Sequence, residues 1–179
     1  LDMASQMPPI ANMLFNYGLI DERERAYTNN VHERVVSLMQ QGKSYESFVE
    51  WNRFWGDCCP CPGCEDNTYT FLNMTGSDNP LEVRSTDTPP SWSWLEGYLD
   101  RADVKQALHA KADRAFVEQN NKVYMAMSSS GDAQNATLPL LPALVASYDV
   151  LLYAGQMDAT LGPMSLHAAV NKMMTLPST

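Results

Sequence analysis

A run of apolar and aromatic residues near the C-terminal end constrains the fold more than any other stretch of this sequence. Residues Val150 to Ala154 are all apolar or aromatic, and Gly155 closes the run. A short continuous apolar run of this kind is typical of a strand buried on both faces, although a buried helix segment can show the same pattern. In parallel α/β sheets, functional groups lie just beyond the carboxyl ends of strands. Asp158 is therefore a candidate site carboxylate, and a solvated aspartate after a structural strand is the alternative.

Three amphipathic helices are predicted over the first 56 residues. Apolar residues recur at helical spacing between Pro8 and Gly18, and proline is tolerated in a first helical turn. Asp21 followed by Glu24 resembles a capping box at the start of a second helix, and Ser44 is the expected cap of a third. These helices are expected over residues 8–17, 21–41 and 44–55, and the third is expected to turn inward Tyr45, Phe48, Trp51 or Asn52, and Trp55.

The remaining sequence is less regular and contains one predicted strand. Residues 57–91 are rich in Pro, Gly, Asp, Asn and Ser, which predicts a loop-rich excursion with an extended stretch only at residues 69–72. Residues 116–127 fit either a helix or a strand, and residues 128–135 a polar loop. A lone strand buried on both faces cannot satisfy its backbone hydrogen bonds, so we expect its sheet neighbours outside this sequence. Short helices are expected over 103–109, 138–147 and 165–174, the last one capped by Ser165.

Composition narrows the classes of protein that fit. The chain has 12 basic and 21 acidic residues and a net charge of −9, which argues against a nucleic-acid or anionic-membrane surface. No apolar run approaches the roughly 18 residues that a membrane span requires. The sequence begins at Leu1 rather than Met and has no charged-then-apolar leader, so we expect it to be a piece of a longer protein.

Several segments, in their order along the chain, resemble one family of enzymes. Residues 151–158, L-L-Y-A-G-Q-M-D, are similar to a family strand written V-L-I-Y-x-G-x-x-D, and residues 103–109 are similar to its D-V-x-x-A-L-H segment. Residues 73–76 match an N-x-T-G found in several members, and residues 2–21 are similar to the stretch that leads into its helical cap. The family is the serine carboxypeptidases, a branch of the α/β-hydrolase fold.

The resemblance implies an α/β fold class and a division of the chain. The chain would be part of an α/β-hydrolase fold, mainly the helical cap insertion with one core strand and flanking helices, and helix-rich in isolation. Residues 1–20 would hold the end of a core segment and a helix leading into the cap. Residues 21–91 would form the helical cap with its cysteine-containing loop region. Residues 92–179 would return to the core and include the strand bearing Asp158.

The resemblance also implies a serine-type carboxypeptidase that hydrolyses C-terminal peptide bonds with a Ser-Asp-His triad. Asp158 would be the acid of that triad. No G-x-S-x-G occurs, because the serines that precede Gly131 lack the preceding glycine. The nucleophile is expected before Leu1 and the histidine after Thr179, so the piece alone should be inactive. Many members carry a cysteine and an asparagine where this chain has Leu161 and Gly162. This difference bears on which subgroup of the family the chain resembles more than on the role of Asp158.

The three histidines are not expected to complete the triad. His32 lies beside Glu33 and Arg34 and is expected to be solvated on a charged helix face. His109 belongs to the D-V-x-x-A-L-H helix and is more simply a structural hydrogen-bonding residue. His167 follows the candidate acid after a turn and within a helix, which makes a catalytic role improbable.

A compact group of cysteines is the other candidate site, and it consists of Cys58, Cys59, Cys61 and Cys64. Disulfides are favoured over zinc, because known zinc spacings separate two cysteine pairs by a dozen or more residues. Three internal pairings are possible, and partners outside the sequence remain open. Two N-x-Thr sequons make Asn73 and Asn135 candidate glycosylation sites. Trp51 and Trp55 fit a helical core better than a substrate cleft, and Trp92 and Trp94 are undecided.

These observations lead to one preferred function and two alternatives. The expected partners are peptide or protein substrates, bound through their C-terminal residue, with no cofactor, no metal, no nucleic acid and no membrane span. The expected location is the secretory pathway, either lysosomal or vacuolar, or extracellular. The alternatives are a non-catalytic helical binding module stabilised by disulfides or zinc, and a relative that lost its nucleophile. A complete module would bury residues 150–154 in its own fold.

Overall fold

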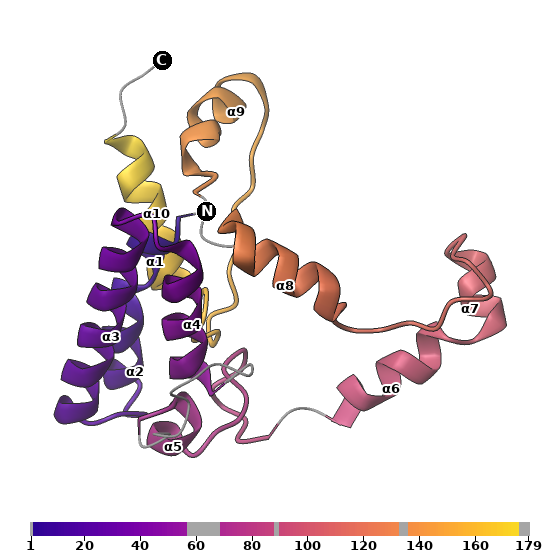
Figure 1. Ribbon diagram of the computed structural model, residues 1–179, viewed down its shortest axis with the longest axis horizontal. Helices are drawn as coiled ribbons and strands as arrows, with labels where there is room; N and C mark the ends of the chain where they lie inside the picture. The colour runs from indigo at the N-terminus through magenta and orange to yellow at the C-terminus, as the bar shows by residue number, and fades with distance from the viewer. Residues whose placement is uncertain (1, 57–68, 88–89, 133–135, 176–179) are drawn as a thin grey trace.

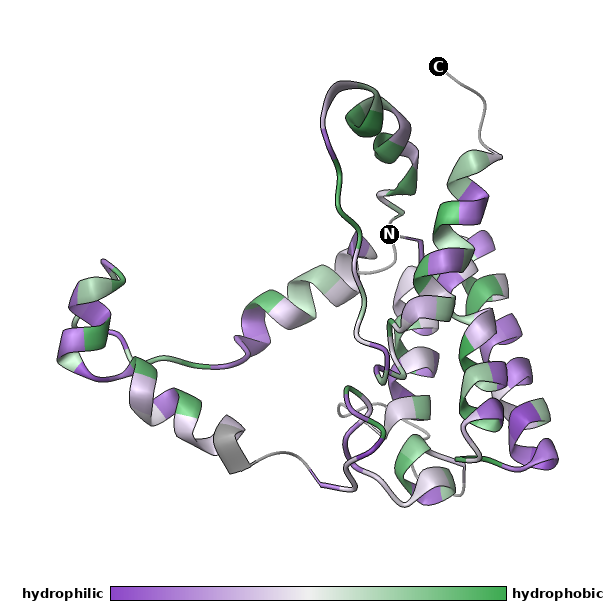
Figure 2. Cartoon of the chain, turned by 180° about the vertical axis from the view of Figure 1, so that it is seen from behind, coloured by the Kyte–Doolittle hydropathy of each residue, from purple (hydrophilic) through white to green (hydrophobic). Residues whose placement is uncertain are grey.

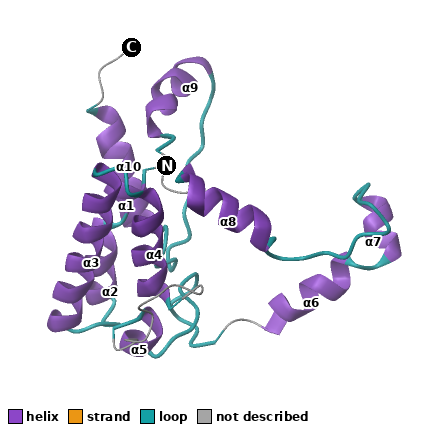
Figure 3. Ribbon diagram, viewed as in Figure 1, coloured by secondary structure: helices purple, strands orange, loops and turns teal. Residues whose placement is uncertain are grey.

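Helices make up all the regular secondary structure in the residues that the structure, a computed structural model, describes: 2–56, 69–87, 90–132 and 136–175. In chain order the elements are α1 (Met3–Gln6), α2 (Pro8–Asn16), α3 (Glu22–Gln40), α4 (Ser44–Trp55), α5 (Phe71–Thr75), α6 (Pro90–Leu99), α7 (Ala102–Ala107), α8 (Asn121–Ser130), the 3-10 helix η2 (Leu138–Leu140), α9 (Leu141–Ser147) and α10 (Pro163–Met174). Figure 3 shows these helices joined by loops. The helix-rich character that we expected for this chain is confirmed.

The helices divide into a packed bundle and an extended excursion. The bundle consists of α1 to α5 with α10, so the last helix of the chain returns to the first ones (Figure 1). From residue 90 onward the chain leaves the bundle through α6 and α7, which lie far from it, and comes back through α8. None of the helices in the described part of the chain is both long and apolar enough to cross a membrane.

One hydrophobic core lies inside the bundle. Its buried members come from α2, α3, α4, α5, the residue before α2 and the loops before α3 and α10, and they are Met7, Ile10, Met13, Leu14, Ile20, Val31, Val35, Phe54, Phe71 and Ala159. Trp51 and Trp55 are half-buried and pack against this core, as predicted. Burying each large apolar side chain contributes about 1.5–3 kcal/mol, which makes this core the main source of stability for the bundle.

The predicted helices of the bundle are confirmed, and so is the capping box. The Glu24 backbone N–H donates to Asp21 Oδ1 over 2.8 Å, and the Asp21 N–H donates to Glu24 Oε2 over 2.8 Å. Each bond satisfies a backbone group that the first turn of α3 leaves without a helical partner. α2 begins at Pro8, as expected.

Two of the predicted caps and one inward side chain are wrong. Ser44 is the first helical residue of α4 and Lys43 precedes it, without a side-chain capping bond. Ser165 lies inside α10, because Pro163 already begins that helix after Gly162. Tyr45 is 41% exposed rather than inward, because α4 buries the face that carries Phe48 and Phe54 instead.

Two stretches between the bundle helices also differ from prediction. The extended stretch expected at residues 69–72 is the start of a short helix, since Thr70 caps α5 by accepting a bond from the Asn73 N–H. The segment expected to be a polar loop from residue 128 begins as the last turn of α8, which ends at Gly131. Asn120 caps α8, so the ambiguous stretch is helical from residue 121 onward, whereas residues 116–120 are neither helix nor strand.

The apolar run at residues 150–154 is extended but is not a buried strand. It pairs with no other segment in the described part of the chain, and Leu151 and Tyr153 are 83% and 87% exposed. Figure 2 shows hydrophobic residues along this segment and along α9, away from the bundle. A strand requires a neighbour for its backbone hydrogen bonds, and none of the described segments supplies one. The α/β sheet implied by the resemblance is therefore not present among these residues.

Candidate active site around Asp158

Asp158 lies in a tight loop between the extended segment and α10, and its carboxylate is held on one side. Oδ1 accepts hydrogen bonds from the Thr160 backbone N–H at 2.7 Å, from the Thr160 hydroxyl at 2.6 Å, and from the Leu161 N–H at 3.0 Å. No donor among the described residues bonds Oδ2. The side chain is half-buried. One carboxylate oxygen is thus fixed by the loop, and the other is left for a further partner.

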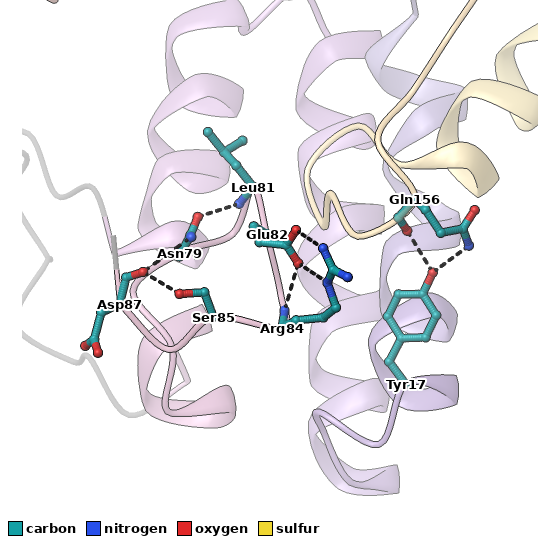
Figure 4. A network of polar contacts seen from close by, with 8 residues as sticks. All are labelled: Tyr17, Asn79, Leu81, Glu82, Arg84, Ser85, Asp87 and Gln156. Carbon is teal, nitrogen blue, oxygen red and sulfur yellow. Dashed lines mark hydrogen bonds and ion pairs between the residues drawn. The ribbon is translucent and has the colours of Figure 1, made fainter. Parts of the chain in front are cut away.

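Hydrogen bonds attach this loop to residues 80–83 on one side and to the end of α2 on the other. The Ala159 N–H donates to the Pro80 carbonyl over 2.8 Å, and the Val83 N–H donates to the Met157 carbonyl over 3.0 Å. On the other side the Tyr17 hydroxyl donates to the Gln156 carbonyl over 3.0 Å (Figure 4). The residues on both sides of Asp158 are therefore held by segments far away in the sequence.

The segment that holds Met157 and Ala159 is itself organised by polar side chains (Figure 4). The Leu81 N–H donates to Asn79 Oδ1 over 3.3 Å. The Arg84 guanidinium donates two hydrogen bonds to the Glu82 carboxylate, over 2.8 and 2.7 Å. These bonds lower the pKa of Glu82 to about 2. Ser85 donates to the Asp87 carbonyl over 2.7 Å. These contacts shape the turn that presents its backbone to the acid loop.

Gly162 permits the tight packing of the acid loop. A Cβ at this position would lie 2.3 Å from the carbonyl oxygen of Asp158 and 3.2 Å from Met13 Sδ. Carbon atoms cannot approach a backbone oxygen that closely, so any side chain here would displace the loop. The role of Gly162 depends on packing against a distant helix, for which the sequence contains no signal.

A groove of about 470 Å³ adjoins the acid loop. Thr160 and Leu161 form one wall, and the aromatic face of α4 forms another. Asn52 on α4 donates from Nδ2 to the hydroxyl of Tyr124 on α8 over 3.0 Å, which adds a polar contact to this mainly apolar surface. The lining residues are Met3, Phe48, Trp51, Asn52, Trp55, Pro80, Leu81, Tyr124, Thr160 and Leu161. The groove therefore offers apolar and aromatic walls beside the candidate acid.

The four tryptophans have different surroundings. Trp51 and Trp55 contact each other in an edge-to-face arrangement, with ring centroids 5.2 Å apart, and serve both the core and the groove wall. Trp92 and Trp94 on α6 are exposed and belong to neither. The question that the sequence left open for these two is answered in favour of a surface position.

His32 is buried, and the prediction of a solvated side chain is wrong. It is 1% exposed, with its ring 5.4 Å from Phe54 and 5.8 Å from Trp51, centroid to centroid. Neither ring nitrogen has a hydrogen-bond partner within the described part of the molecule. Burial lowers the pKa of His32 to about 4, so the ring is neutral near pH 7. The missed signal is that position 32 follows Thr28 at the spacing that α3 buries.

No other histidine or serine completes a triad with Asp158 among the described residues. His109 and His167 are exposed, and His167 lies within reach of Asn171 on its own helix. Ser128 is buried in α8 and donates to the Tyr124 carbonyl over 2.7 Å. Asp158 is therefore the one predicted triad residue that the structure places beside a groove.

The remaining predicted sites are partly visible. Asn73 is exposed on α5. Within the residues that the structure describes, no three His, Cys, Asp or Glu side chains gather as metal ligands. The other candidates, Cys58, Cys59, Cys61, Cys64 and Asn135, lie outside the described residues.

Comparison with known proteins gives a consistent result. The family profile described as serine carboxypeptidase matches residues 1–179. A probable serine carboxypeptidase of Dictyostelium discoideum is 24% identical over 162 residues, which are 90% of this chain and 30% of that protein. The venom serine carboxypeptidase of Apis mellifera is 29% identical over 147 residues, 81% of this chain and 30% of that protein. The chain thus spans less than a third of the length of these relatives. No solved structure matches it.

Proposed function

The chain belongs to the serine carboxypeptidase family, and from this membership we propose that it contributes the acid of a Ser-Asp-His triad to a peptidase. The enzyme would hydrolyse the C-terminal peptide bond of peptides or proteins. The observation that carries the proposal is the carboxylate of Asp158, because its Oδ1 is held by three donors while no residue in the described part of the chain bonds its Oδ2. That is the arrangement an acid needs in order to receive a second, catalytic donor.

In the proposed mechanism Asp158 acts through a histidine. A serine hydroxyl attacks the scissile carbonyl, and the histidine takes the serine proton and then passes it to the leaving amine. Asp158 accepts a hydrogen bond from the other ring nitrogen, holds the correct tautomer and stabilises the imidazolium. We place both partners outside residues 1–179, since the sequence contains no G-x-S-x-G and no described histidine bonds the acid.

The groove beside Asp158 supports a peptide ligand. Its walls are mostly apolar and aromatic, and Thr160 and Leu161 belong both to the groove and to the loop that holds the carboxylate. A peptide side chain in this groove would therefore lie next to the catalytic machinery. The exposed run at residues 150–154 supports the same proposal, since a self-contained binding module would bury it.

The deciding experiment is the substitution Asp158→Asn in the full-length protein. With a blocked dipeptide as substrate, we expect kcat to fall about 10⁴-fold, because the amide favours the wrong histidine tautomer. Asp149→Asn is the matched control, since this exposed aspartate lies close by in sequence, and we expect it to leave kcat unchanged. Equal activity of the two variants would rule out Asp158 as the acid.

The full-length protein also separates the proposal from its alternatives. We expect release of the C-terminal residue to stop after treatment with a serine-directed fluorophosphonate. A full-length protein that folds but neither hydrolyses the substrate nor reacts with this reagent would be a pseudoenzyme or a binding module. Hydrolysis by residues 1–179 alone would contradict our placement of the serine and histidine elsewhere.

We further propose a secretory route, ending in a lysosome or vacuole or outside the cell. The support is the pair of sequons, the cysteine group and the venom named for one relative. Disulfides are proposed for Cys58, Cys59, Cys61 and Cys64, and N-linked glycans for Asn73 and Asn135. A mobility shift after glycosidase treatment and thiol counting before and after reduction would test both.

A further inference from the structure

We propose that Thr160 is a positioning residue of the triad, and this inference rests on the proposed function of Asp158. Thr160 supplies two of the three donors to the carboxylate, one from its backbone at 2.7 Å and one from its hydroxyl at 2.6 Å. The hydroxyl bond is the only one of the three that a side chain makes, so it is the one that the sequence can gain or lose by substitution.

The geometry explains why the hydroxyl matters. Rotation about the last bond of an aspartate side chain is soft and roughly two-fold, so an unrestrained carboxylate can turn or exchange its two oxygens. Hydrogen bonds to an ionised carboxylate are about twice as strong as neutral ones, and three of them converge on Oδ1 of Asp158. Together they keep Oδ2 pointing in one direction, as the acid of a triad requires.

The surroundings of the loop prevent it from compensating for a lost bond. Ala159 is fully buried and its N–H is bound to the Pro80 carbonyl. Gly162 packs so closely under Asp158 that no larger residue fits. The backbone on both sides of Thr160 is therefore fixed, and removal of the hydroxyl leaves the carboxylate with more freedom while the loop keeps its path.

The test compares Thr160→Val with Thr160→Ser in the full-length protein. Valine has nearly the shape of threonine but no hydroxyl, whereas serine keeps the hydroxyl. We expect the valine variant to lose roughly 10- to 100-fold in kcat with KM changed less than about twofold, since small misplacements near the chemistry cost rates of this size. The serine variant should recover most of the rate.

Thr175→Val is the matched control. Its hydroxyl also donates a bond, to the Lys172 carbonyl over 2.7 Å, but at the exposed end of α10. We expect its kcat to equal that of the unchanged protein. Should Thr160→Val fail to fold, as judged by its melting temperature, Thr160→Ala removes the hydroxyl without adding a methyl group at a half-buried site.

Each remaining outcome overturns the inference. An unchanged kcat in the hydroxyl-free variants would show that the hydroxyl positions nothing. A raised KM with an unchanged kcat would make Thr160 a substrate contact of the groove, and a serine variant as slow as the valine variant would assign the effect to the methyl group. If Asp158→Asn retains full activity, the triad proposal itself is wrong. If Asp158→Asn is inactive and Thr160→Val is fully active, only the positioning role of Thr160 is wrong.

Discussion

The helical bundle and the excursion from residue 90 to residue 153 use similar apolar side chains in opposite ways. The bundle buries them: Met13, Leu14 and Val35 are fully enclosed. The excursion presents most of them to solvent, apart from Leu138 and Leu141, which are buried against Ala169 of α10. Figures 1 and 2 show that the excursion lies largely away from the bundle. Its most exposed large apolar residues are Trp94, Leu108, Leu140, Tyr148, Leu151 and Tyr153.

This difference in burial indicates where the packing partners of each region lie. The apolar stripe of α3 faces α2 and α4, which precede and follow it directly in sequence, so α3 finds its packing partners among its neighbours in the chain. Most helical stability in proteins comes from such packing rather than from the helix itself. For α6 and the segment 150–154, no comparable partner exists among the described residues, and a long apolar face without cover is a surface for association.

The largest expected effect comes from truncating one core ring and one exposed ring. Phe54 is 2% exposed at the contact of α3 and α4, and Trp94 on α6 is 69% exposed. We expect Phe54→Ala to lower the free energy of unfolding of the chain by about 3–5 kcal/mol, because it leaves a cavity in the core. Trp94→Ala should change it by less than about 0.5 kcal/mol. Urea unfolding followed by circular dichroism measures both.

The two variants can contradict the contrast between a packed bundle and an exposed excursion in two ways. A large loss from Trp94→Ala would mean that α6 is buried in solution, by self-association or by the bundle. A small loss from Phe54→Ala would mean that the bundle is loosely packed. Repeating the measurement at several protein concentrations separates self-association from folding, because only association depends on concentration.

The sequence predicted the bundle helices and, in the excursion, the short helices at α7 and α9, but it did not predict the setting of the run at 150–154, and the reason is physical. A capping box and apolar residues at helical spacing are local signals, so Asp21, Glu24 and the inward face of α3 could be found from the sequence. A strand is defined by its neighbour, so the run at 150–154 predicted a buried strand that the described residues cannot complete.

The candidate site shows the same limit. Asp158 was found from its position after the apolar run, but its setting depends on contacts across the chain, such as Tyr17 with Gln156. Gly162 was missed as a site residue for this reason, because its role depends on packing against Met13. Thr160 was missed although it bonds Asp158 from only two residues away. The burial of His32 was missed although its signal was local. The charged residues at positions 33 and 34 suggested a solvated face, whereas His32 lies on the buried side of α3.

The second effect is a pH dependence confined to the bundle. The pKa of buried His32 is about 4, below its value near 6.5 in an unfolded chain. Between these two values His32 is protonated in the unfolded chain but neutral in the folded chain. The folded state therefore loses stability as the pH falls from about 6.5 towards about 4. By pH 5 this should cost on the order of 2 kcal/mol. Unfolding measured in urea at pH 7 and pH 5 tests the loss.

The control variants separate the contribution of His32 to the pH dependence from that of the other ionisable groups. His32→Leu keeps an apolar side chain of similar size in the contact with Phe54 and should remove most of the difference between pH 7 and pH 5. His167→Gln, at an exposed position on α10, should leave the difference in place. If His32→Leu shows the full pH dependence, His32 is protonated in the folded chain or is not buried.

The smallest expected effect comes from removing one helix cap in the bundle and one in the excursion. Asp21 caps α3, which the core holds in place, and Asn120 caps α8, whose one buried residue is Ser128. Replacing a capping side chain by alanine costs about 1 kcal/mol of helix stability. In Asp21→Ala we expect this cost to appear in the global unfolding, because the start of α3 lies between Ile20 and Thr28, which are both buried. In Asn120→Ala we expect it to appear only as local fraying.

Amide hydrogen exchange distinguishes local fraying from global unfolding, since fraying speeds exchange only at the end of the affected helix. We expect Asn120→Ala to raise exchange near Lys122 and Val123, whose N–H groups bond the Asn120 side chain, without shifting the urea midpoint. A shift of the midpoint as large as that of Asp21→Ala would show that α8 unfolds together with the bundle. The contact of α8 with α4 through Asn52 and Tyr124 would then join the two regions into one cooperative unit.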